Sequence, residues 1–175
     1  MANQLTRDIH LLPEREAFLF NERENNSSRC THCEKIQQEI GEHSLVLYHG
    51  AHCTIKLSSM PYNTGHLQIL PSRHVLLITE LMDNENLDIM HATQLCVSVL
   101  EDIYAPDGFS IGSRTGTTNL NRLPQHLCFH VIPRWQGDVN LIEAIDTRRE
   151  LDIIIKQAYL RLASAFENNV SRAVY

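Results

Sequence analysis

The chain has 175 residues and a mass of 20.1 kDa, and 43% of its residues are hydrophobic, which fits one compact domain with a sizeable core. Its net charge of -6 argues against a protein that binds extended nucleic acid, because that task requires a strongly basic balance. No run approaches the roughly 20 apolar residues that span a bilayer, and the first residues lack the apolar core of a signal peptide, so we expect a cytoplasmic protein without membrane contact. The 10 histidines and the odd number of 5 cysteines suit metal binding or chemistry in a reducing compartment better than a disulfide framework.

The chain contains no internal repeat and no Gly- or Pro-rich linker, so a single folded unit is predicted. Residues 1–29 show no clear periodicity and are predicted to form an N-terminal arm that leads to the domain at residues 30–175. Within the domain, short apolar runs rich in β-branched residues alternate with turn-forming residues, as is typical of strands. These runs predict five strands, at residues 44–49, 52–59, 66–72, 108–113 and 126–133.

Two long helices are predicted from apolar positions that recur at helical spacing. The first covers residues 84–104 with Asn84 as its N-cap, and its inward positions are expected to be Leu87, Met90, Val97, Leu100 and Tyr104. The second is expected from about residue 142 to residue 167, with inward positions Leu151, Ile154, Ala158, Leu162 and Phe166. Strands interleaved with two long helices predict an α+β fold in which helices pack on an antiparallel sheet.

Cys30 and Cys33 form a CxxC pair just before a short helical pattern at residues 34–40. Two thiolates at that spacing can bind one zinc ion, because the turn between them directs both sulfurs to the same side. The same spacing also occurs in redox pairs and in ordinary buried thiols. The pair alone therefore leaves its role open, and a structural zinc site needs two further ligands from elsewhere in the chain.

The strand predicted at residues 126–133 carries an unusual pattern. Side chains alternate along a strand, so His126, Cys128 and His130 share one face while the apolar residues between them share the other. Such a row is either a solvated polar face opposite the core or a set of groups for metal binding and nucleophilic chemistry. Three such groups followed by Pro-Arg-Trp favour the second interpretation.

The segment HLCFHVIPRW resembles the signature of the histidine-triad (HIT) family, in which three histidines alternate with apolar residues on one strand. From MPYNTGHLQILPSRHV through PDGFSIG to HLCFHVIPRWQGDVN, the chain is similar to the diadenosine tetraphosphate phosphorylase branch, with the motifs in the same order. The resemblance implies an antiparallel sheet with helices against it, usually in a homodimer, and a nucleotide or dinucleoside polyphosphate as ligand. It also implies a structural zinc ion bound by Cys30, Cys33, His74 and His126.

The resemblance places the family's nucleophile, the middle histidine of the triad, at Cys128. In the family this imidazole attacks the α-phosphorus and holds the nucleotide as a phosphoramidate. A thiol must first lose its proton, so Cys128 needs a nearby cation to lower its pKa. The residues that the resemblance assigns to ligand binding are Ser58, Ser110, Arg114, Gly116 and Arg122.

This pocket departs from the family pattern, and two interpretations remain open. In the first, Arg114 and Arg122 replace the usual glycine-rich phosphate turn with guanidinium groups, and the chain is a remodelled nucleotide hydrolase, transferase or phosphorylase. Cys128 is then the nucleophile, and His130 orients it or helps to deprotonate it. In the second, the nucleophile and its pocket have lost their function together, which leaves a catalytically silent nucleotide-binding or protein-interaction module.

Overall fold

The computed structural model describes residues 30–116, 126–138 and 148–173, so the predicted arm at residues 1–29 lies outside the described part of the chain. The strands of that part are β1 (Val46–His49), β2 (Cys53–Leu57), β3 (Leu67–Pro71), β4 (Gly108–Arg114) and β5 (Cys128–Arg134). The helices are α2 (Thr31–Ile36), α3 (Asp83–Tyr104) and α4 (Arg148–Ala173), with a short 3-10 helix η2 (Ile78–Glu80). None of these helices combines the length and the apolar character needed to cross a membrane.

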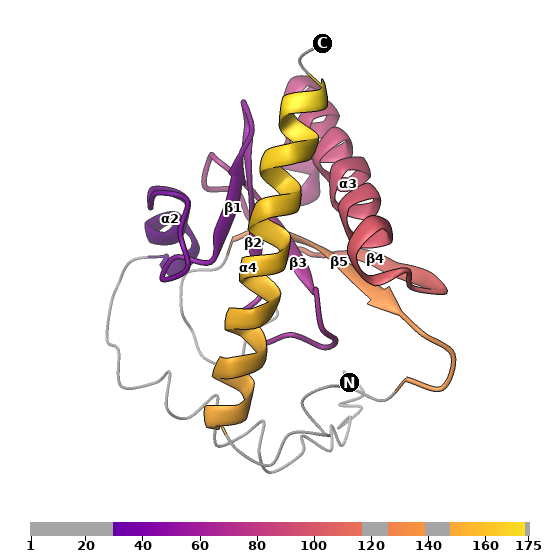
Figure 1. Ribbon diagram of the computed structural model, residues 1–175. Coiled ribbons are helices and arrows are strands. Elements are labelled where there is room, and N and C mark those ends of the chain that lie inside the picture. The colour runs from indigo at the N-terminus through magenta and orange to yellow at the C-terminus, as the bar shows by residue number, and fades with distance from the viewer. Residues whose placement is uncertain (1–29, 117–125, 139–147, 174–175) are drawn as a thin grey trace, which may run out of the picture.

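The five strands form one antiparallel sheet in the order β1-β2-β3-β5-β4 (Figure 1). The first two strands form a hairpin, in which the Gly50 amide donates to the Cys53 carbonyl at 2.8 Å where the chain turns. After α3, the chain returns to the far edge of the sheet as β4, and β5 then enters between β3 and β4. The α+β class and the antiparallel sheet are therefore as predicted.

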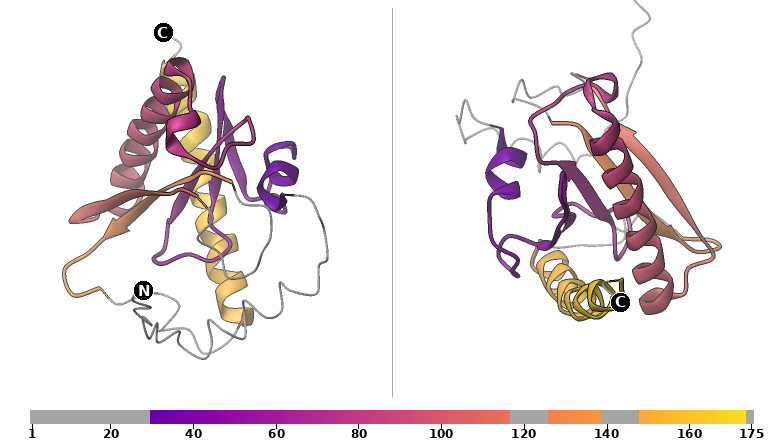
Figure 2. Two further views of the ribbon diagram at one scale, coloured as in Figure 1. Left: turned by 180° about the vertical axis from the view of Figure 1, so that it is seen from behind. Right: turned by 90° about the horizontal axis from the view of Figure 1, so that it is seen from above.

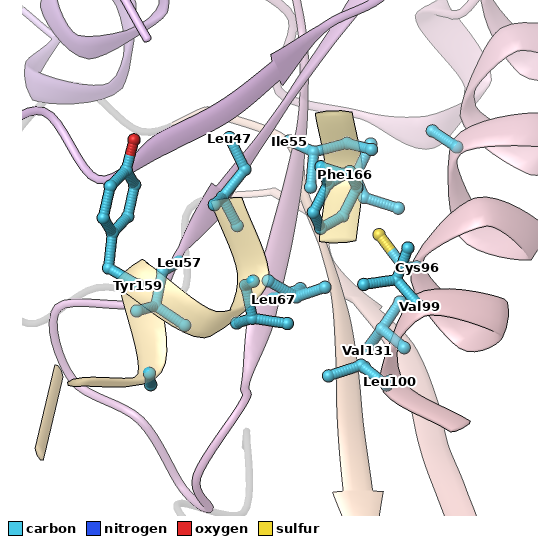
Figure 3. Close-up of a cluster of buried hydrophobic side chains, with 14 of the residues drawn as sticks. Leu47, Ile55, Leu57, Leu67, Cys96, Val99, Leu100, Val131, Tyr159 and Phe166 are labelled. Atoms are coloured by element: carbon cyan, nitrogen blue, oxygen red, sulfur yellow. The ribbon is translucent and has the colours of Figure 1, made fainter. Parts of the chain in front are cut away.

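Helices α3 and α4 pack against each other and against one face of the sheet, while α2 lies apart from both of them (Figure 2). The core fills the space between these two helices and the sheet (Figure 3). It contains side chains from alternate positions of the strands, such as Ile55, Ile69 and Val131, all fully buried. Because strand residues alternate between faces, Cys128 and His130 belong to the face opposite α3 and α4.

A glycine turn precedes β3 and fixes where that strand begins. Gly65 has a φ of +82°, and a Cβ atom at this position would lie 2.9 Å from side-chain atoms of both Leu100 and Tyr104. Glycine is therefore required for its backbone conformation and for the close approach of α3. The turn delivers His66 directly to the start of β3.

The predicted inward face of α3 is partly wrong. The helix begins at Asp83 with Met82 as its N-cap, so Asn84 lies inside the first turn. Leu87 and Met90 are each 58% exposed, whereas the predicted Leu100 is fully buried. The other buried positions of the helix are Glu85, Ile89, Ala92, Thr93, Cys96 and Val99. The buried stripe includes small and polar residues, which a search for large apolar residues does not select.

The other helices also differ from their predicted bounds. α2 begins at Thr31, because Cys30 serves as its N-cap, and it ends at Ile36 before the predicted Ile40. The predicted start of α4 near residue 142 lies outside the described residues, and the helix continues to Ala173. Ile154 is only half-buried, because its neighbour Ile155 takes the inward position.

Candidate functional site

A cluster of two cysteines and two histidines forms where β3 ends and β5 begins. Antiparallel pairing brings these strand ends together, so His74, three residues after β3, approaches His126, two residues before β5. α2 adds the two cysteines, since Cys30 at its N-cap and Cys33 in its first turn face the same side. The four predicted metal-ligating residues therefore come together, with their ligand atoms all within 4.8 Å of one another.

The distances in this cluster fit a tetrahedral metal ion. The Cys33 sulfur lies 3.1 Å from His74 Nδ1 and 3.5 Å from His126 Nδ1, and the Cys30 sulfur lies 3.7 Å from His126 Nδ1. Zinc–sulfur bonds of about 2.3 Å and zinc–nitrogen bonds of about 2.0 Å, at tetrahedral angles, separate sulfur from nitrogen by about 3.5 Å. The observed spacing therefore requires little movement of the side chains to accept zinc.

A backbone carbonyl sets the tautomer of His126. The ring donates its Nε2–H to the Pro71 carbonyl at 2.8 Å, so the lone pair is on Nδ1, which faces the two cysteines. Ligating histidines typically use their second nitrogen in this way, and the hydrogen bond fixes the orientation of the ring. The chain thus supplies both the ligand atom and the support behind it.

An ion pair supports the loop that carries His74. Arg73 donates to both carboxylate oxygens of Glu85, from Nε at 3.0 Å and from a terminal nitrogen at 2.8 Å. The Glu85 carboxylate also accepts a hydrogen bond from the Met82 amide at 2.8 Å. The hydrogen bond from Arg73 is the main cause that lowers the pKa of Glu85, and the Met82 amide contributes to the same shift. Glu85 is 5% exposed, so the pair joins the loop to the start of α3.

Cys128 opens β5 and is fully buried. It pairs in register with Arg114 on the edge strand β4, an exposed residue whose side chain shares its face of the sheet. Burial raises the pKa of the Cys128 thiol to about 12, although the positive charges of Arg114 and Lys56 act in the opposite direction. At neutral pH the sulfur is therefore a thiol and not a thiolate.

His130 is the last member of a hydrogen-bonded chain that starts at the backbone. The Tyr62 amide donates to His66 Nδ1 at 3.2 Å, so His66 must carry its proton on Nε2, which lies 2.9 Å from His130 Nδ1. His130 Nδ1 is then the acceptor, and its remaining proton sits on Nε2. Burial lowers the pKa of His66 to about 3 and that of His130 to about 4, so both rings are neutral at pH 7.

This chain restricts the chemistry of His130. The one ring nitrogen with a free lone pair, Nδ1, already accepts a hydrogen bond from His66, so the ring cannot take the thiol proton of Cys128 without a rearrangement. Its Nε2–H is instead available as a hydrogen-bond donor. The arrangement favours orienting a ligand oxygen over the deprotonating role considered from the sequence.

The predicted ligand-binding residues fall into different settings. Ser58 is buried beside His66, and its hydroxyl accepts the Met60 amide at 3.2 Å. Ser110 is exposed on β4, on the same face as Arg114. Gly116 has a φ of +77° and donates its amide to the Leu76 carbonyl at 2.8 Å, while Arg122 lies outside the described residues.

Sequence reasoning missed two residues near the sheet face that carries Cys128 and His130. Lys56 is 1% exposed in the middle of β2, and its register neighbour Gln68 pairs in turn with His130. His32, between the two cysteines, has a buried Nδ1 with no hydrogen-bond partner among the described residues. The available signal was a lysine inside the otherwise uncharged strand CTIKL, at a position that alternates with the core residues.

Comparison with known proteins identifies the family to which this chain is related. The HIT domain model matches residues 39–137 of the chain. AP-4-A phosphorylase of Mycobacterium tuberculosis is 34% identical over 130 residues, which make up 74% of this chain and 67% of that protein. The chain belongs to the HIT family.

Solved structures of HIT proteins share the fold. A HIT-like protein of Bartonella henselae, described as involved in cell-cycle regulation, superimposes with a TM-score of 0.60 at 19% identity, covering 79% of this chain and 98% of that one. A zinc-bound histidine triad protein of Mycobacterium smegmatis gives a TM-score of 0.54 at 20% identity, covering 79% and 99%. The family resemblance read from the sequence is therefore confirmed. The HIT match includes His126, Cys128 and His130 and starts after Cys30 and Cys33.

Proposed function

We propose that this HIT protein binds a nucleotide or dinucleoside polyphosphate at Cys128 and acts on it as a hydrolase, transferase or phosphorylase. The observation that carries the proposal is the placement of Cys128 and His130 in one row of β5, with the Arg114 cation in register beside them. The 34% identity to an AP-4-A phosphorylase supports dinucleoside polyphosphates as the first ligands to test. Ser58 and Ser110 on the same face and Arg122 complete the proposed ligand-binding set.

In the proposed reaction, the Cys128 sulfur attacks the α-phosphorus of the ligand. A phosphorus–sulfur bond forms as the bond to the bridging oxygen breaks, and the thiol hydrogen ends on the departing oxygen. His130 Nε2–H and Arg114 hydrogen-bond to the phosphoryl oxygens, on which negative charge increases. Water, phosphate or another acceptor then displaces the sulfur and releases the nucleotide.

The experiment is incubation with diadenosine tetraphosphate, followed by intact-mass spectrometry, peptide mapping and chromatography of the products. We expect one nucleotidyl group on Cys128, together with turnover. A Cys128→Ala variant should show neither. A Cys53→Ala variant, which removes another buried thiol on β2, should retain both.

A second candidate function is a nucleotide-binding module without catalysis. The observation in its favour is the raised pKa of Cys128, which keeps the sulfur protonated, together with the occupied lone pair of His130. Nucleotide affinity with no adduct and no turnover would establish this candidate and exclude the enzymatic one. Turnover gained by a Cys128→His variant would show that the rest of the pocket is intact, whereas no turnover would show that other parts of the pocket are defective too.

We also infer that Cys30, Cys33, His74 and His126 hold one structural zinc ion. The donor set is typical of zinc, and the sulfur–nitrogen distances and the Pro71 support of His126 fit it. A bound ion joins α2 to the ends of β3 and β5, so its contribution is to stability. The cluster supplies four ligands and no open position, which separates it from the step at Cys128.

The assembly that we propose is a homodimer in the cytosol. β4 is the last strand of the sheet among the described residues, and its Ile111 is 53% exposed, so a second copy can add its own β4 to this edge. The exposed Leu87 and Met90 of α3 supply further apolar surface. None of the five cysteines, all of which lie in the described part of the chain, forms a disulfide, which suits a reducing compartment.

Light scattering coupled to size-exclusion chromatography tests the dimer. The variant Ile111→Lys adds a charge to the exposed edge strand and should elute as a monomer. Leu160→Lys places the same charge at an equally exposed apolar position on α4 and should remain dimeric. A monomeric wild type, or an Ile111→Lys variant that stays dimeric, would contradict the proposed interface.

A further inference from the structure

Lys56 is the largest fully buried side chain in the described part of the molecule, with 1% of its surface exposed. Lysine is among the residues that are almost never fully buried unless they are paired. Its strand, β2, is otherwise made of cysteine, threonine, isoleucine and leucine, and all five of its residues are buried. A charged group at this position therefore needs a physical explanation.

The partners of Lys56 within the described residues are uncharged. Its Nζ donates to the Leu57 carbonyl at 3.0 Å and to Gln68 Oε1 at 3.1 Å. No carboxylate in the described part forms an ion pair with it. An ammonium group has three N–H donors and one full charge, so two neutral oxygens satisfy it only in part.

The groups that surround Lys56 do not provide the missing negative charge. Along its row of the sheet lie Gln68 and then His130, and the next row contains Cys128 and Arg114. Besides burial, a second cation, Lys35 of α2, lowers the pKa of Lys56, which falls to about 7. Only a Cys128 thiolate would act against this, and Cys128 is a protonated thiol at neutral pH. His66 and His32, which also sense its charge, are neutral rings.

We propose that Lys56 is an anion-binding residue of the site, which holds one phosphate group of the ligand while Arg114 holds another, with Cys128 between them. The proposal rests on the proposed function, and it adds that the preferred ligand has at least two phosphates in a chain. The Leu57 and Gln68 contacts keep the ammonium over β2 and β3. β4 lies two strand spacings beyond β3, about 10 Å away, so a single phosphate does not serve both cations well.

This assignment accounts for the uncompensated charge. A phosphate beside Lys56 supplies the counter-charge that the described residues do not provide, and it favours the protonated form of the amine. Ligand binding near pH 7.5 should therefore be accompanied by proton uptake. His66 and His130 contribute little at that pH, because their pKa values of about 3 and about 4 lie too far below it.

The test is isothermal titration calorimetry of the full-length protein with adenosine, AMP, ADP and inorganic tripolyphosphate, in two buffers of different ionisation enthalpy. In Lys56→Met the side chain keeps its length and loses its charge. We expect its affinity for ADP and tripolyphosphate to fall at least about tenfold, its preference for ADP over AMP to shrink and its proton uptake to disappear. Its affinity for adenosine should stay within about twofold.

Two controls separate binding from folding. Lys156→Met removes an exposed lysine that pairs with Glu42 on the surface, and it should bind every probe like the wild type. Lys56→Met should unfold at the same temperature as the wild type or higher, because it removes a buried charge without a charged partner. A lower unfolding temperature would instead give Lys56 a structural role and overturn the proposal.

The remaining outcomes distinguish this inference from the proposed function. Unchanged ADP affinity in Lys56→Met, or an equal loss for adenosine and ADP, would overturn the phosphate assignment and leave nucleotide binding intact. A wild type that binds tripolyphosphate through Lys56 but binds no nucleotide would overturn the proposed function and support the anion site. A wild type that binds none of the probes would overturn both.

Discussion

The two ends of one row on β5 differ in how they are built. Two residues before the strand, His126 joins the three other potential metal ligands, whose positions follow from the backbone at the paired ends of β3 and β5 and at the N-terminus of α2. Two and four residues further on, Cys128 and His130 depend on long or titratable side chains that arrive from β2, β4 and the turn before β3. The positions of the side chains around His126 follow from the backbone, whereas the properties of Cys128 and His130 depend on nearby charges and on the position of a proton.

The difference teaches which features of this fold can change independently. A tetrahedral metal site needs four donor atoms that each lie within a few tenths of an ångström of the ideal distance from the metal, so a ligand is either kept or lost. The pKa of Cys128 is a balance between burial, which raises it, and the cations Arg114 and Lys56, which lower it. A single substitution, such as one at position 56, therefore changes this pKa gradually. A HIT chain can therefore keep the scaffold around His126 while the face around Cys128 takes on a different ligand.

Removal of one zinc ligand should have the largest effect. In Cys33→Ser a weak hydroxyl ligand replaces a thiolate, so the ion should be lost, and the free energy of unfolding should fall by about 3 kcal/mol or more. Elemental analysis of freshly purified protein should give one zinc per chain in the wild type and in the control His91→Gln, an exposed residue of α3. Urea unfolding measures the stability change. A wild type with well under one zinc per chain would contradict the proposed zinc site.

The paired histidines should make stability dependent on pH to a smaller extent. Both pKa values are lowered from 6.5, to about 3 for His66 and about 4 for His130, so between pH 6.5 and pH 4 the unfolded chain binds protons that the folded chain does not. Stability should therefore be complete above pH 6.5 and fall as the pH decreases, by about 1.4 kcal/mol per pH unit for each ring.

Urea unfolding at several pH values from 7 to 5 measures this dependence. His66→Gln keeps a donor toward His130 and an acceptor for the Tyr62 amide but does not titrate, so its stability should decrease less steeply with falling pH than that of the wild type. His91→Gln removes an exposed histidine and should follow the wild type. Equal slopes for His66→Gln and the wild type would show that the paired rings do not hold their protons as described.

The fold was predictable because its signals are local and repeated. Each strand was visible as an apolar run between turn residues, and order-specific motifs indicated the family. The inward face of α3 was less predictable. Ala92 and Thr93 are buried where small residues let the helix approach the sheet, whereas Leu87 and Met90 face outward. Periodicity records apolar character and does not tell a buried apolar position from an exposed one.

The four clustered ligands were predictable from the family resemblance, which assigned His74 and His126 to a CxxC pair that was ambiguous by itself. The importance of Lys56 was hard to predict, because a lysine in a strand is ordinarily a solvated residue, even within the otherwise uncharged strand CTIKL. Its role depends on register, which places it in line with His130 across β3. The tautomer of His130 was also hidden, since it depends on the backbone amide of Tyr62.

The smallest expected effect concerns the loop that holds His74, the one exposed ligand of the cluster. Arg73→Met removes the ion pair to Glu85 and the donor to the Glu80 carbonyl, which gives His74 more freedom without removing any ligand. Zinc transfer to a coloured chelator should become about tenfold faster, while freshly purified protein still contains one zinc per chain. Arg134→Met removes an ion pair with the same 2.8 Å distance and the same 42% exposure of the arginine, at the opposite end of β5, and should release zinc at the wild-type rate. Similar rates for the two variants would mean that the strand ends alone position His74, and the metal cluster would then owe its geometry entirely to the backbone.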